Sequence, residues 1–93
     1  MKIYEIVDGT DNEKYGFFCP ACGFGHWFKI KGDGPKWTWN EDRDKPTISP
    51  SILAWSDDFR CHSFVKNGKI KFCNDCTHDK KGQEMGLPDW ENT

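Results

Sequence analysis

Cys19-Pro20-Ala21-Cys22-Gly23 is a C-x-x-C turn, which brings two sulfurs within reach of one metal ion. Zinc prefers thiolate and imidazole ligands and takes four of them in a tetrahedron. Two later clusters, one beginning at Cys61 and one containing Cys76, hold the other three cysteines and two of the three histidines. The pattern predicts one zinc ion per chain, Zn2+, bound by residues that are far apart in the sequence.

The chain has 93 residues and a net charge of -2, a length that suits one domain. A domain of this size buries only about 60 to 70 % of its unfolded surface, so a structural zinc worth on the order of 10 kcal/mol would contribute much of its stability. We therefore expect a single zinc-binding β domain over residues 1–93. The odd number of cysteines and the absence of a long apolar run favour the reducing cytoplasm.

Short stretches of alternating polar and apolar residues predict strands rather than helices. Strands are expected over residues 2–7, 26–31 and 37–39, and residues 51–55 suit a strand or a short helix. The two prolines of residues 46–51 argue against a central strand there, because proline cannot donate to the hydrogen-bond ladder. The expected fold is a small, mostly antiparallel β domain of the zinc-ribbon or knuckle type, with little helix.

Asn67-Gly68 gives the clearest local prediction, a β-hairpin closed by a type I′ turn. The turn fixes the register as follows: Lys66 opposite Lys69, Val65 opposite Ile70, Ser63 opposite Phe72, and Cys61 opposite Asn74. Cys61, Val65, Ile70, Phe72 and, if the strand continues, Cys76 should then share one face of the hairpin, and His62, Phe64, Lys71 and Cys73 the other.

This register makes Cys61 and Cys76 diagonal neighbours, so the favoured ligand set is Cys19, Cys22, Cys61 and Cys76. His78 is the first substitute for either hairpin cysteine, and His62 and Cys73 are further alternates. A second set, which pairs two C-x-x-C turns, consists of Cys19, Cys22, Cys73 and Cys76. Spacing alone does not decide between these sets. His26 is expected to make a hydrogen bond near the metal without binding it.

Hydroxyl residues near position 50 could suggest a nucleophile, but no acid or base lies at a recognisable spacing from them. We interpret Thr47, Ser49 and Ser51 as turn hydroxyls and predict no catalytic residue. Five tryptophans could form a platform for nucleic-acid bases, although in a chain poor in aliphatic residues they suit the core better. They are Trp27, Trp37, Trp39, Trp55 and Trp90.

Several blocks in fixed order resemble a family of short phage- and prophage-encoded proteins of unknown function. The blocks are Cys-Pro-x-Cys-Gly followed by His26, Trp37-Thr38-Trp39-Asn40, Pro46-Thr47-x-Ser49-Pro50-Ser51, Cys61-His62-Ser63-Phe64, Asn67-Gly68-Lys69-Ile70, and Asp75-Cys76-Thr77-His78 through Gly82-Gln83. The resemblance implies that Cys19, Cys22, Cys61, His62, Cys76 and His78 occupy motif positions, whereas Cys73 departs from the usual apolar residue. Some members carry the name ammonia monooxygenase, a membrane-embedded copper enzyme that this chain, lacking an apolar span, does not match.

Three functions fit these patterns. The leading hypothesis is a zinc-stapled module that binds a host or phage protein in the cytoplasm, as a monomer or a homodimer. The second is a nucleic-acid binder that uses the lysines of the basic stretch from residue 60 to residue 81 on phosphates, namely Lys66, Lys69, Lys71, Lys80 and Lys81. The third is a metal-dependent hydrolase in which His62 and His78 hold a metal and Asp75 or Asp79 acts as base.

Overall fold

The computed structural model describes residues 1–89, so Trp90 lies outside the described residues. The described chain contains eight strands and no helix, which confirms the prediction of a small antiparallel β domain. The strands are β1 (Tyr4–Ile6), β2 (Glu13–Phe18), β3 (Gly25–Lys31), β4 (Thr38–Trp39), β5 (Ile48–Ser56), β6 (Phe59–Lys66), β7 (Lys69–Phe72) and β8 (Glu84–Gly86). Nothing in residues 1–89 forms a helix that is long and apolar enough to cross a membrane.

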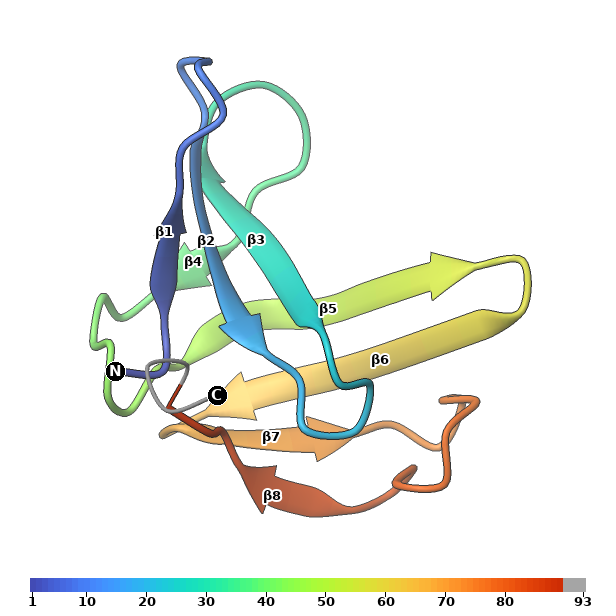
Figure 1. The fold of residues 1–93 in the computed structure, drawn as a ribbon. Helices are drawn as coiled ribbons and strands as arrows, with labels where there is room; N and C mark the ends of the chain where they lie inside the picture. Colours follow the sequence, from blue (N-terminus) through green and yellow to red (C-terminus); the bar gives the residue numbers. More distant parts are fainter. Residues whose placement is uncertain (90–93) are drawn as a thin grey trace.

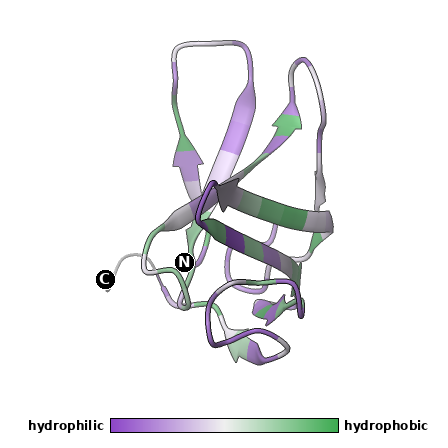
Figure 2. Cartoon of the chain, turned by 90° about the vertical axis from the view of Figure 1, so that its right-hand side faces the viewer, coloured by the Kyte–Doolittle hydropathy of each residue, from purple (hydrophilic) through white to green (hydrophobic). Residues whose placement is uncertain are grey.

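The strands form two antiparallel sheets, ordered β1-β2-β3 and β4-β5-β6-β7-β8. The second sheet runs across the first, and the long β5–β6 hairpin projects beyond it (Figure 1). Hydrophobic residues are concentrated in the strands, whereas the long turns are mostly hydrophilic (Figure 2). The two sheets enclose one core, made of Ile3, Tyr15, Phe17, Phe28, Ile48, Ile52, Val65, Ile70, Phe72, Leu87 and three cysteines.

The β6–β7 hairpin has the predicted register through three pairs, Ser63 with Phe72, Val65 with Ile70, and Lys66 with Lys69. The turn residues Asn67 and Gly68 have φ angles of 51° and 78°, as a type I′ turn requires. Pairing ends at Phe72, so the predicted pair of Cys61 with Asn74 does not form. The chain instead leaves the strand as a loop that stays hydrogen-bonded to β6.

The expectation that prolines exclude residues 46–51 from a central strand is wrong for the second half of that stretch. Pro50 lies in β5, which is flanked by β4 and β6. The register jumps from Ile48 opposite Val65 to Ile52 opposite Ser63, so three residues of β5 face one residue of β6. Such a bulge interrupts the ladder, and a proline there has no pairing donor to lose.

Replacing Gly68 by alanine should destabilise the fold more than replacing Gly9, although both glycines have a φ of +78°. A Cβ at Gly68 would lie 3.1 Å from the backbone oxygen of Asp44, whereas a Cβ at Gly9 meets nothing within 4 Å. Gly9→Ala then costs only the left-handed backbone strain, about 1 kcal/mol, and Gly68→Ala about 2 kcal/mol or more. Urea denaturation of the two variants measures the difference, and equal losses would show that the contact with Asp44 has no effect.

Candidate functional site

Three cysteines and one histidine meet where the end of β2, the start of β3 and the first half of β6 come together. Cys19, Cys22, His26 and Cys61 each place one donor atom within 4.8 Å of the others. Cys19, His26 and Cys61 are buried, and Cys22 is half-buried. The C-x-x-C turn closes on itself because the Gly23 amide donates to the Cys19 carbonyl at 3.0 Å. These four residues can hold one metal ion.

The surroundings of His26 fit a metal at this position. Its Nε2 atom is buried, and no hydrogen-bond partner reaches it from the described residues. A buried imidazole nitrogen normally finds a partner, because leaving it unpaired costs about 1 to 3 kcal/mol. A metal ion among the three sulfurs would supply that partner. His26 is therefore a ligand candidate in its own right, whereas the sequence had suggested a supporting role only.

The charges of Cys19, Cys22 and Cys61, called here the sulfur cluster, also favour binding of a cation. The pKa of Cys19 is lowered to about 4, chiefly because the Cys61 thiol donates a hydrogen bond to its thiolate. The pKa of Cys22 is raised to about 12 by burial and by the neighbouring Cys19 charge, and that of Cys61 is raised by the hydrogen bond to Cys19 and by burial. Neighbouring thiolates repel one another, so the first thiol to ionise raises the pKa of the others. A divalent cation compensates these negative charges and allows further cysteines to ionise.

Cys61 belongs to a second group as well, with Cys76 and His78, whose donor atoms also lie within 4.8 Å of one another. The His78 Nε2 atom is 3.4 Å from the Cys61 sulfur. The structure thus brings Cys19, Cys22 and Cys61 of the predicted set together, while Cys76 belongs to the second group, which shares Cys61. Cys73 and His62 lie in neither of these two groups, so His62 and His78 do not share a metal site.

The lysines of the nucleic-acid hypothesis lie around β7 and the loop after it. Lys66, Lys69 and Lys71 are exposed on the β6–β7 hairpin, with Lys71 opposite Glu84 of β8. Lys81 is exposed and Lys80 half-buried in the following loop. An acidic partner beside Lys71 weakens the positive potential of this stretch.

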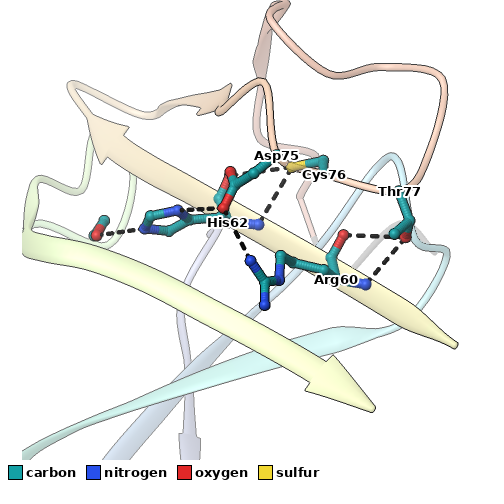
Figure 3. Close-up of polar contacts among 6 residues, drawn as sticks. Arg60, His62, Asp75, Cys76 and Thr77 are labelled. Atoms are coloured by element: carbon teal, nitrogen blue, oxygen red, sulfur yellow. Dashed lines mark hydrogen bonds and ion pairs between the residues drawn. The ribbon is translucent and has the colours of Figure 1, made fainter. Parts of the chain in front are cut away.

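A serine, a histidine and an aspartate form a hydrogen-bonded chain on the opposite face of β6. The Ser51 hydroxyl oxygen is 2.8 Å from Nε2 of His62, and Nδ1 of His62 is 3.3 Å from Oδ2 of Asp75. His62 lies between Asp75 and a serine hydroxyl (Figure 3). An imidazole that carries its proton on Nδ1 donates to Asp75 and accepts from Ser51. This is the arrangement of a serine nucleophile, its general base and the carboxylate that orients the base.

Different contacts position Ser51, His62 and Asp75. Ser51 lies in the β5 bulge, and its carbonyl accepts a hydrogen bond from the Trp37 indole at 3.1 Å. The backbone of His62 is fixed on β6, where its carbonyl accepts from the Cys73 amide at 2.8 Å and its amide donates to the Cys76 sulfur at 3.2 Å. Asp75 lies between those two cysteines in the loop, so the same contacts place its carboxylate beside the imidazole.

The interpretation of Ser51 as a turn hydroxyl without a nearby base was wrong. The signal was present in the predicted hairpin, which put His62 on the outward face of β6. The partner strand could not be predicted, because the two prolines of residues 46–51 argue against a central strand there. The pairs of Leu53 with His62 and Ile52 with Ser63 place Ser51 diagonal to His62 on the outward face.

Apolar side chains surround the serine and histidine on the exposed face of the β5–β6 hairpin. Leu53, Trp55 and Phe64 are 45 %, 69 % and 52 % exposed, and the Phe64 ring stacks near His62 with centroids 6.2 Å apart. A cleft of about 470 Å³ lies beside the second half of β5, and Ser51 is not among the residues that line it. It is lined by Phe24, Gly25, His26, Trp27, Trp37, residues 52–56 and Phe59.

Comparison with protein families gives a match over residues 1–73 to a family described as "Bacterial ubiquitination-like system serine protease (BubE)". Comparison with curated proteins and with solved structures gives no significant match. The matched region covers most of the chain and includes Ser51 and His62, while Asp75 lies two residues beyond its end. The chain therefore belongs to the BubE family of bacterial ubiquitination-like system proteins.

Proposed function

We propose that this protein is a serine protease of a bacterial ubiquitination-like system, with Ser51 as the nucleophile. The observation that carries the proposal is the hydrogen-bonded chain from Ser51 through His62 to Asp75. The description of the family supports it independently, because the match rests on sequence and the chain of hydrogen bonds on structure.

The roles follow from the two ring nitrogens of His62. Nε2 accepts the hydroxyl proton while the Ser51 oxygen attacks the substrate carbonyl, and the resulting imidazolium gives that proton to the leaving amine. The acyl group left on Ser51 is then hydrolysed by a water molecule, which His62 deprotonates in turn. Asp75 accepts the Nδ1 proton in a hydrogen bond, keeps the ring in the correct tautomer and stabilises the positive charge.

The sulfur cluster would have a structural role in this enzyme, with zinc as its ion. Cys19, Cys22, His26 and Cys61 would complete a tetrahedral shell, which leaves no position for a reacting water. The ion would fix Cys61, which directly precedes the general base, and its neighbour Cys76 directly follows Asp75. A metal ion at the cysteines would thus help to fix the backbone next to both His62 and Asp75.

The partner is proposed to be the protein substrate, held on the exposed apolar face that contains Leu53, Trp55 and Phe64. An extended peptide can add to an exposed sheet edge while pockets hold its alternate side chains. In this proposal, the protein-interaction surface of the earlier hypothesis serves to bind the substrate. The reducing cytoplasm is the proposed location, because it keeps the cysteines as thiols that can bind metal.

The test is cleavage of a bacterial ubiquitin-like protein that carries a reporter at its C-terminus. The purified protein should release the reporter, and intact-mass measurement of both products identifies the broken bond. Uncleaved fusion in the presence of folded, metal-loaded protein would count against this substrate class.

Asp75→Asn should retain the fold and lower kcat in that assay by about 10²-fold. The amide can donate as well as accept, so it no longer selects the tautomer with the proton on Nδ1. The loss is expected to be smaller than for a buried triad, since the Asp75 side chain is 44 % exposed and shared with the Arg60 guanidinium at 3.6 Å. Asp79→Asn, in the same loop, is the matched control and should leave kcat unchanged.

A further inference from the structure

His62, Cys73 and Asp75 form a third group of potential metal ligands, separate from the sulfur cluster around Cys61. One donor atom of each residue lies within 4.8 Å of the other two. His62 and Cys73 are half-buried and Asp75 is exposed, so an ion from solvent can reach the group. Two of its members are also the proposed general base and its orienting carboxylate.

The loop after β7 holds the three ligands together before any ion binds. The Cys73 amide donates to the His62 carbonyl, and the Cys76 sulfur accepts the His62 amide proton. Asp75 lies between these two cysteines in the sequence. Its carboxylate faces the His62 ring (Figure 3). A preorganised set of donors loses little conformational entropy when a metal binds, which favours affinity.

The chemistry of the three donors selects zinc over the hard cations. Imidazole, thiolate and carboxylate are all zinc ligands, whereas magnesium and calcium prefer shells made of oxygen. Nδ1 of His62 and Oδ2 of Asp75 are 3.3 Å apart. Two ligands about 2.0 to 2.2 Å from one tetrahedral zinc are separated by nearly the same distance.

We propose that Zn2+ binds to His62, Cys73 and Asp75 and thereby switches off Ser51. Zinc on Nδ1 forces the ring proton onto Nε2, and the Cys73 thiol releases its proton to solvent. Nε2 then donates to Ser51 and can no longer accept the hydroxyl proton, and Asp75 is occupied by the metal. Inhibition rests on the proposed protease function, whereas metal binding at this site does not.

Binding is measured first, by adding Co2+ to protein whose sulfur cluster is already filled with zinc. Wild-type protein should take up one further equivalent and show a thiolate-to-cobalt charge-transfer band. Cys73→Ser should lose the band and bind the ion at least about 100-fold more weakly, since even loss of a residue behind a ligand costs 10-fold to 100-fold. Arg60→Gln should bind it more tightly, because the guanidinium 3.6 Å from Asp75 opposes a cation. Asp79→Asn should behave as the wild type.

Inhibition is measured next, with added Zn2+ in the cleavage assay. Wild-type activity should fall at least tenfold at saturating zinc, and Cys73→Ser should stay active at the same concentration. Equal inhibition of both proteins, or uptake of the added Co2+ without a thiolate band in the wild type, would overturn the proposal. Band formation in a protein that cleaves nothing would overturn the inhibitory role and the protease function while leaving the metal site in place.

Discussion

Ser51→Ala should lower kcat/KM for peptide cleavage by at least about 10³-fold, with little change in KM. In the proposed mechanism the serine oxygen forms the bond to the substrate carbonyl. Among residues 1–89, no other hydroxyl lies in the hydrogen-bonded chain with His62. Removing this oxygen leaves only the rate enhancement that comes from binding the substrate and polarising its carbonyl group. Steady-state kinetics on the purified variant measure the loss, after circular dichroism and metal content have verified its fold.

Ser49→Ala is the matched control, because Ser49 lies in the same bulged part of β5 but is exposed. Its backbone carbonyl accepts from Thr38, and its side chain is not part of the hydrogen-bonded chain. The variant should keep wild-type kinetics. A Ser51→Ala protein that is folded and as active as Ser49→Ala would remove Ser51 from the mechanism.

Cys61→Ser should abolish the folded state or cost at least several kcal/mol of its stability. Cys61 is buried at 1 % exposure and is shared by both groups of donors around the sulfur cluster. Without its sulfur the cluster loses the ligand from the second sheet, so a metal would no longer join that sheet to the C-x-x-C turn. Denaturant unfolding followed by circular dichroism, with metal content measured in parallel, tests the effect.

Cys73→Ser provides the comparison for Cys61→Ser, because its sulfur lies outside the groups that contain Cys61. With no metal added to the group of His62, Cys73 and Asp75, it should change the unfolding free energy by no more than about 1 kcal/mol, because substitutions outside the core usually have small effects. Chelation of wild-type protein should reproduce the effect of Cys61→Ser, and added zinc should reverse it. A chelated protein with an unchanged unfolding midpoint would show that the metal is not structural.

The parts of the fold that could be predicted are those with local causes. Asn67-Gly68 fixes the hairpin register because the type I′ turn forces both neighbouring strands, and the predicted inward and outward faces follow from that register. The C-x-x-C turn is likewise a local feature. Neither required knowledge of which distant strands pair.

The proposed catalytic residues could not be predicted for the opposite reason. Ser51 meets His62 only because β5 pairs with β6 in spite of Pro50, and the bulge that permits this is a property of the pair of strands. Asp75 reaches His62 only because the loop after β7 folds back onto β6 through Cys73 and Cys76. His26 also required the structure, since its unpaired Nε2 is visible only in the buried core.

The most direct test of the central claim is reaction with a fluorophosphonate, which labels serines activated by a neighbouring base. Intact mass should show one adduct per chain, and peptide mapping should place it on Ser51. His62→Ala, verified as folded, should lose the label because the hydroxyl is no longer deprotonated. An unlabelled wild-type protein, or an adduct on another residue, would contradict the assignment of Ser51 as a nucleophile activated by His62.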